Sequence, residues 1–144
     1  MHGQSESVET KLAIFRHKFP RPEGYNTDRI ALSETLLREE FKEVMEALAN
    51  YEVASEFARI WKSDQLAKDT LRKRRAELLK ELCDLVYVAV DAAVAEKLPF
   101  DVAFNRVHAS NMSKLGEDGK PVYREDGKVT KGPNYKPAQL EDLV

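Results

Sequence analysis

Apolar residues recur at three- and four-residue intervals along most of the first 114 positions, which is the spacing of amphipathic helices. The pattern predicts a first helix over about residues 5–19, with Ser5 or Ser7 as its cap. Three residues then break this helix: Pro20, Pro22 and Gly24. A second helix is predicted to follow, capped by Asn26 or Thr27.

The second predicted helix has a narrow apolar stripe. At about 100° per residue, the residues of this stripe are Leu37, Phe41, Val44 and Leu48. Glu40 and Glu43 lie beside the stripe, at the expected edge of the core, whereas Glu46 lies further round toward solvent. The pattern therefore separates two kinds of glutamate on one helix.

The helical pattern continues over residues 51–75, with a predicted break at Ser63-Asp64. A further helix is predicted from about Arg75 to Lys97. It is apolar nearly all round from Leu82 to Ala95, so it is expected to be the most buried helix. Asp84 lies inside this run, and the run contains no lysine or arginine to pair with it. A buried charge is costly unless it is paired or binds a metal, so Asp84 suggests a function.

A last helix is predicted from a cap at Asp101 to about Ser113, and the composition then changes. Residues 115–144 are rich in glycine and proline, and Asp126-Gly127 between short apolar segments is a β-hairpin signal. The string Glu-Asp-Gly-Lys occurs at 117–120 and again at 125–128, which indicates reused turn chemistry. The tail has too little apolar content to fold alone, so we expect it to wrap the helical body.

These elements predict a single all-α domain over residues 1–144. It has four to five helices in a body of about residues 5–114, followed by the tail of residues 115–144. The chain is 42% apolar and 33% charged, and its net charge of −2 gives no general attraction to nucleic acid or to anionic membranes. No signal-peptide pattern is predicted, the strongly apolar run Leu85–Val90 is too short to span a bilayer, and Cys83 is the single cysteine. A cytoplasmic protein is therefore expected.

Two acidic pairs carry the candidate chemistry. Glu40 and Glu43 are three residues apart, as are Glu81 and Asp84, so each pair shares one face of a helix. If the two faces meet, they form a group of four carboxylates that needs a cation. Oxygen ligands favour Mg²⁺ or Mn²⁺, and the chain has no His/Cys cluster for zinc. Because Mg²⁺ shares its remaining positions with phosphate oxygens, the site predicts phosphoryl chemistry assisted by more than one metal ion.

Other functions are less consistent with the sequence. A di-iron bundle needs Glu-x-x-His pairs, and none of the three histidines has a glutamate three residues before it. Neither Asp-Gly-Lys stretch has the alternating ligands of an EF-hand. A non-enzymatic helical interaction module remains an alternative, in which the acids are surface charges. In that alternative the basic cluster of Lys68 and residues 72–75 is a docking patch. Otherwise the cluster is a solvated face or a group that steers phosphates.

The order Glu39-Glu40-x-x-Glu43 and then Glu81-x-x-Asp84 resembles the signature of the MazG-like all-α nucleoside triphosphate pyrophosphohydrolases. That superfamily includes phosphoribosyl-ATP pyrophosphohydrolases and dimeric dUTPases. The flanking residues 35–38 and 85–88 match too. Two later segments, residues 107–114 and 126–133, resemble a subgroup with dUTPase-like activity. The resemblance covers roughly residues 30–140.

This resemblance implies that Glu40, Glu43, Glu81 and Asp84 bind two or three Mg²⁺ ions, with Mn²⁺ as the alternative. It implies that a metal-activated water attacks the α-phosphorus of a nucleoside triphosphate and releases pyrophosphate and a monophosphate. Glu39 would bind a further metal or position the water, so the catalytic base is Glu39 or Glu40. The implied substrate contacts are Asn111 and Lys114, with Lys131 and Tyr135 of the tail. The implied assembly is a homodimer or a dimer-of-dimers tetramer whose sites are lined by more than one chain.

Two departures from the family pattern limit what the resemblance implies. The segment between Glu43 and Glu81 is longer than in many members, which predicts an extra helical stretch. The N-terminal helix carries no matching motif, so the base of the substrate stays open. The subgroup likeness favours a deoxynucleotide related to dUTP, dCTP or dGTP, with phosphoribosyl-ATP as the alternative.

Overall fold

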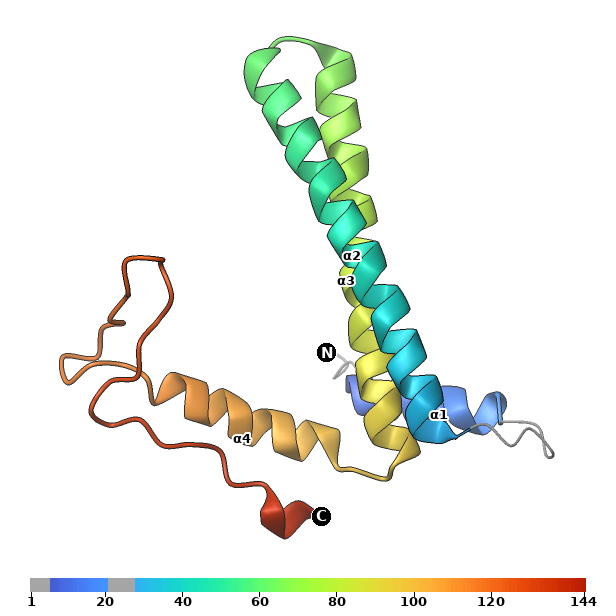
Figure 1. Cartoon of the computed structure of the whole chain (residues 1–144), viewed down its shortest axis with the longest axis vertical. Coiled ribbons are helices and arrows are strands. Elements are labelled where there is room, and N and C mark those ends of the chain that lie inside the picture. The colour runs from blue at the N-terminus through green and yellow to red at the C-terminus, as the bar shows by residue number, and fades with distance from the viewer. Residues whose placement is uncertain (1–5, 21–27) are drawn as a thin grey trace, which may run out of the picture.

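A long antiparallel pair of helices dominates the computed structural model, which describes residues 6–20 and 28–144 (Figure 1). The helices are α1 (Val8–Lys18), α2 (Arg29–Ile60), α3 (Gln65–Ala95) and α4 (Phe100–Met112), with a 3₁₀ helix η1 (Glu141–Leu143) at the end. The described residues contain no β-strand. The predicted all-α fold with four main helices is confirmed.

Helix α1 begins as the sequence predicts, because the hydroxyl oxygen of Ser7 accepts a hydrogen bond of 3.1 Å from the N–H of Thr10. Ser5, the other predicted cap, lies outside the described residues. The side chain of Leu12 is fully buried against the rest of the fold. Figure 1 shows α1 crossing the lower end of the α2–α3 pair.

Side-chain caps set the ends of the long helices. The Asp28 carboxylate accepts hydrogen bonds from the N–H groups of Ile30 and Ala31 and starts α2. The predicted caps Asn26 and Thr27, like the predicted breakers Pro22 and Gly24, lie outside the described residues. The predicted break at Ser63-Asp64 is confirmed, because Asp64 caps α3 through a 2.8 Å hydrogen bond from the N–H of Ala67.

The predicted start of a helix near Arg75 is wrong, because α3 runs without interruption from Gln65 to Ala95. The residues around Arg75 are strong helix formers, and neither glycine nor proline occurs among them. A 31-residue helix is about 46 Å long at 1.5 Å per residue, and α2 has 32 residues. The long segment between Glu43 and Glu81 therefore lengthens both α2 and α3, which form one hairpin.

Much apolar surface on this hairpin is left uncovered by the chain. On the predicted stripe of α2, Val44 is 5% exposed but Phe41 is 57% exposed. On α3, Val90 is fully buried, whereas Leu82 and Val86 are exposed. Within the predicted apolar run of α3, the buried residues lie near its C-terminal end, where α1 packs on it. The expectation that this is the most buried helix is wrong for the single chain, because α2 and α3 have three buried residues each.

The buried charge on α3 is Asp91. Its carboxylate receives two hydrogen bonds from the guanidinium of Arg16 on α1, and both side chains are largely shielded from solvent. A charge in such a position requires a partner. The ion pair therefore joins α1 to the C-terminal half of α3.

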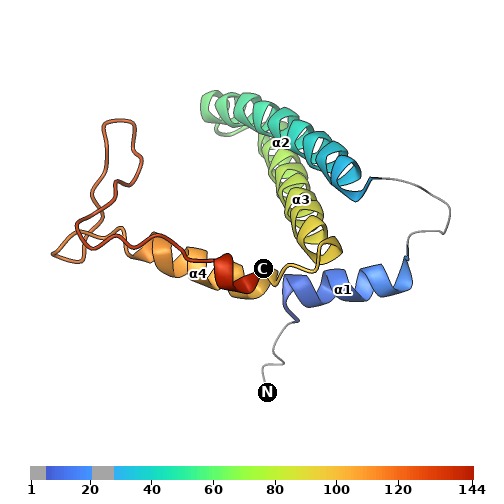
Figure 2. The same ribbon diagram turned by 60° about the horizontal axis from the view of Figure 1, so that its bottom comes forward.

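Helix α4 begins differently from the prediction. Pro99 occupies the cap position without a side-chain hydrogen bond, and Asp101 lies inside the first turn. The N–H of Asp101 instead donates to the Glu9 carboxylate at 2.7 Å. A negative group at a helix N-terminus is favourable, so Glu9 replaces the predicted cap. From this point α4 leads away from the α2–α3 hairpin, as Figures 1 and 2 show.

The C-terminal tail folds back along α4. The N–H of Lys136 donates to the Ser113 hydroxyl at 2.8 Å, and Arg106 pairs with Asp142. Within the helical body the tail contacts α4 through these bonds, and it follows α4 away from the hairpin (Figure 1). The expectation that the tail wraps the helical body stays a prediction.

The two Glu-Asp-Gly-Lys strings form the same turn. Asp118 accepts a hydrogen bond from the N–H of Lys120, and Asp126 accepts one from the N–H of Lys128. Gly119 has φ of 74° and Gly127 has φ of 79°. The predicted hairpin pairing around Gly127 is limited to one antiparallel bridge, between residues 123 and 129. The reuse of turn chemistry is confirmed.

Candidate metal centre

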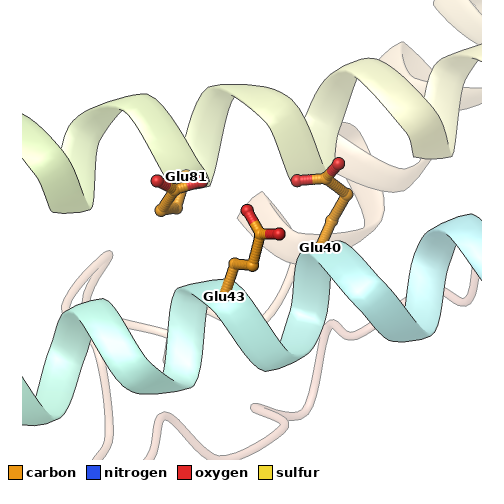
Figure 3. A group of neighbouring side chains, drawn as sticks. All are labelled: Glu40, Glu43 and Glu81. Carbon is orange, nitrogen blue, oxygen red and sulfur yellow. The ribbon is translucent and has the colours of Figure 1, made fainter.

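Three carboxylates meet in the space between α2 and α3. Glu40 and Glu43 come from α2 and Glu81 comes from α3, and one oxygen of each lies within 4.8 Å of the others. Figure 3 shows the three side chains turned toward one another between the two helices. The helical hairpin therefore brings Glu40 and Glu43 of the first acidic pair together with Glu81 of the second.

The helical register of α2 explains why Glu40 lies here. Val44 and Ala47, four and seven residues further on, are both buried, so this face of α2 packs against α3. Glu40 lies on the same line, within the seam between the helices. Glu40 is half-buried and Glu43 is exposed, which agrees with the prediction that both lie at the edge of the core. The seam leaves Phe41 of the predicted apolar stripe outside.

The Glu40 carboxylate has an unsatisfied oxygen. Its Oε2 atom is buried and accepts no hydrogen bond from any residue that the structure describes. Burial raises the pKa of Glu40 above its ordinary value of 4.5, and the nearby charges of Glu43, Asp84 and Glu81 raise it further, while Lys80 lowers it. A carboxylate in this position is stabilised by a proton or by a cation.

This group of oxygens fits a divalent cation. Carboxylates are hard ligands of the kind that Mg²⁺ and Mn²⁺ prefer, and they come from two helices that pack together along their length. The Glu40 carboxylate adds a buried oxygen that has no hydrogen-bond partner among the described residues. The donor set and this orphaned atom therefore both fit the metal that the sequence predicts.

Asp84, the fourth predicted ligand, is not part of the group. Its Oδ2 atom is 2.8 Å from the Lys80 Nζ atom, which also donates to Glu81 Oε2 at 3.0 Å. The interpretation that Asp84 is a buried charge without a local partner is wrong, because Lys80 lies just outside the apolar run and one helical turn before Asp84. The four-residue spacing of Lys80 and Asp84 is the signal that would have found this pair.

The other predicted catalytic residue, Glu39, lies on the exposed side of α2. Consecutive residues of a helix are separated by about 100°, so Glu39 and Glu40 cannot both face α3. The structure does not bring Glu39 into the three-carboxylate group. Its assignment as a catalytic residue stays a prediction.

The predicted substrate-binding residues lie elsewhere. The Lys114 ammonium donates to the Asn111 side chain at 2.8 Å, and the Lys131 ammonium is 4.5 Å from the centre of the Tyr135 ring. Both pairs belong to the end of α4 and to the tail, which Figures 1 and 2 show directed away from the hairpin. Within one chain, these residues and the carboxylates do not form a common site.

Several open grooves lie along the hairpin, and two of them are relevant here. One lies between α2, α3 and the start of α4, and its apolar lining includes Leu37, Phe41 and Leu85. The other lies on α3 nearer the tip of the hairpin, and Lys68, Arg72 and Arg75 line it together with apolar residues. The basic cluster of the sequence thus borders an apolar surface of α3 and does not enter the carboxylate group.

We expect cation binding to this site to strengthen as the pH rises. Because the pKa of folded Glu40 is raised above 4.5, a cation must displace a proton from it at low pH. The apparent affinity should rise as the pH passes upward through this raised pKa and level off above it. Calorimetric titration with Mn²⁺ in buffers from about pH 5 to about pH 8 measures the effect. A pH-independent affinity would contradict the assignment of Glu40 as a ligand.

Two comparisons with known proteins bear on this site. A model of the phosphoribosyl-ATP pyrophosphohydrolase family matches residues 6–111, which is more than half of the chain. The matched region includes all four acids and Asn111, and it ends before Lys114 and the tail. No curated protein matches the chain.

Proposed function

Because the chain belongs to the phosphoribosyl-ATP pyrophosphohydrolase family, part of the MazG-like superfamily, we propose that its carboxylate group serves divalent-cation-dependent hydrolysis of a nucleotide between the α and β phosphates. The family establishes a pyrophosphohydrolase, a hydrolase that acts on acid anhydrides. The alternative of a non-enzymatic interaction module is therefore wrong. The observation that supports the proposed site best is the convergence of Glu40, Glu43 and Glu81, one with a buried unpartnered oxygen.

In this proposal Glu40, Glu43 and Glu81 hold the cation, and Asp84 joins them as the fourth ligand. The cation is Mg²⁺, with Mn²⁺ as a substitute, and two or three ions serve one site. When bound, such ions neutralise phosphate charge and lower the pKa of water. Glu81 supports this role because only 17% of its side chain is exposed, so its carboxylate is held in place by packing.

The residues around the cation ligands have separate tasks in this account. The two packed helices fix the spacing of the carboxylates before substrate arrives, which reduces the entropy that binding must overcome. Glu39, exposed beside the group, accepts the proton of the attacking water or positions that water. Asn111, Lys114, Lys131 and Tyr135 contact the substrate from α4 and the tail.

The apolar faces of the hairpin support self-association. A second copy that packs on α2 and α3 would cover Phe41, Leu82 and Val86, which are exposed in the single chain. Because α4 leads away from its own hairpin, the α4 residues of one chain would then reach the carboxylates of another. We expect light scattering to give at least twice the 16.4 kDa of one chain. A single-chain mass would contradict a shared site.

Two substrate classes are supported by different observations. The likeness of residues 107–114 and 126–133 to a dUTPase-like subgroup favours a deoxynucleoside triphosphate of the dUTP, dCTP or dGTP type. The description of the matching family favours phosphoribosyl-ATP. We give the deoxynucleoside triphosphate the greater weight because the tail lies beyond the family match and is folded onto α4.

Rates of pyrophosphate release test this choice. The purified chain is supplied with Mg²⁺ and, in separate reactions, with each common ribo- and deoxynucleoside triphosphate and with phosphoribosyl-ATP. The proposal predicts the highest kcat/KM for a deoxynucleoside triphosphate. Turnover of phosphoribosyl-ATP alone would replace the deoxynucleoside triphosphate by phosphoribosyl-ATP as the assigned substrate. If none of these nucleotides were turned over, both substrate assignments would be wrong.

A further inference from the structure

The carboxylate group has a positively charged neighbour, the ammonium of Lys80. It lies on α3 directly before Glu81, 3.0 Å from Glu81 Oε2 and 2.8 Å from Asp84 Oδ2. One lysine therefore joins both acids of the second pair. It is the only residue recorded in an ion pair with either acid in the described part of the chain, residues 6–20 and 28–144.

Lys80 also accounts for the position of Asp84. The sequence pairs Asp84 with Glu81, but only Glu81 joins Glu40 and Glu43 in the three-carboxylate group. Asp84 is instead held by Lys80, four residues earlier on the same helix, which is the favourable spacing for an ion pair on a helix surface. The fourth carboxylate is thus engaged by the ammonium of Lys80.

We propose that Lys80 competes with the divalent cation for Asp84 and Glu81, so that this lysine sets the affinity of the metal centre. The inference rests on the proposed function. A cation that uses Asp84 and Glu81 must break two contacts of Lys80 and must bind close to a positive charge. Lys80 is 62% exposed, so its flexible side chain can leave the acids and turn into solvent. Lys80 is therefore a positioning residue that acts through its two acidic partners.

The direction of the expected effect separates this role from simple structural support. Removal of a supporting residue weakens cation binding, whereas removal of a competitor strengthens it. In Lys80→Met the apolar stem and the helix propensity are kept, but the charge is lost. We expect this variant to bind Mn²⁺ about fivefold more tightly than the wild type, an effect the size of one or two exposed ion pairs.

The matched control is Lys42→Met. Lys42 pairs with Glu46 at the same four-residue spacing on the exposed side of α2, and neither residue belongs to the carboxylate group. Its Mn²⁺ affinity should equal that of the wild type. Lys80→Arg, which keeps the positive charge, should also stay close to the wild type. All four proteins are titrated with Mn²⁺ in a calorimeter after removal of metal.

Thermal unfolding gives a second readout. Without cation, Lys80→Met should melt below the wild type because its acids have lost their counter-charge, and with saturating Mn²⁺ the two melting temperatures should coincide. Equal or weaker Mn²⁺ binding by Lys80→Met would overturn the role of Lys80 while leaving the metal centre in place. Absence of Mn²⁺ binding by the wild type would overturn the metal centre, and the role of Lys80 with it.

Discussion

Replacement of Glu40 by glutamine is expected to lower kcat/KM for nucleotide hydrolysis by about a thousandfold or more. The carboxylate lies inside the α2–α3 seam with one buried unpartnered oxygen, so it is the group most dependent on a cation. A bound divalent cation contributes several kcal/mol of transition-state stabilisation, and each 1.36 kcal/mol corresponds to a factor of ten. Steady-state kinetics with a pyrophosphate-release assay measures the loss.

The same substitution should not damage the fold. Glutamine has the shape of glutamate without its charge, and burial together with like charges disfavours the ionised form of Glu40. The cation-free variant should therefore be at least as stable as the wild type. Glu46→Gln is the matched control, because Glu46 lies on the exposed side of the same helix. Activity equal to that of the control would show that Glu40 is no ligand.

Replacement of Arg16 by methionine is expected to lower the free energy of unfolding by about 2 to 3 kcal/mol, because it leaves Asp91 as an unpaired charge that is nearly buried. This estimate lies below the range for fully buried pairs, since 23% of the Arg16 side chain is exposed. Urea unfolding at one fixed chain concentration measures the change.

Arg29→Met provides the comparison for this second experiment. Arg29 pairs with Glu96 at 3.5 Å, and both side chains are well exposed, so the expected cost is at most about 0.5 kcal/mol. If Arg16→Met cost no more than Arg29→Met, the pair between α1 and α3 would have no special role. The difference between the two variants thus measures how firmly α1 is held to the hairpin.

The periodic pattern of the sequence was sufficient to predict most of the helices and the approach of Glu81 to Glu40 and Glu43. The three-residue spacing of Glu40 and Glu43 placed both on one face of α2. The apolar residues after Glu81 indicated that its helix packs opposite that face. Both inferences depend on local geometry, which residue spacing determines. The convergence of Glu40, Glu43 and Glu81 is the result.

The failures concern features that depend on distant residues or on weak local signals. Whether Phe41 or Glu40 faces α3 depends on the packing of two helices, and the apolar stripe alone suggested Phe41. The direction of α4 is set by its contacts at residues 9 and 99–101, which no periodicity reveals. Local signals do indicate two of these features. Strong helix formers around Arg75 favour an uninterrupted α3, and a four-residue spacing favours the pair Lys80–Asp84.

No helix of the described residues is long and apolar enough to cross a membrane.

The distribution of charge along the hairpin bears on the kind of ligand that it binds. Acids gather in the middle of the hairpin, while Lys68, Arg72 and Arg75 line the groove nearer its tip. This distribution is consistent with the proposed cation-dependent hydrolysis of a nucleotide, in which carboxylates bind cations and basic residues attract phosphates.

The central claim is that this carboxylate group serves cleavage between the α and β phosphates of a nucleotide. The most direct test is ³¹P NMR of the reaction in ¹⁸O-labelled water with Mg²⁺, run with and without a chelator. The account predicts monophosphate and pyrophosphate in equal amounts, ¹⁸O on the monophosphate alone, and no reaction with the chelator present. Release of orthophosphate and a diphosphate, or turnover that survives the chelator, would contradict it.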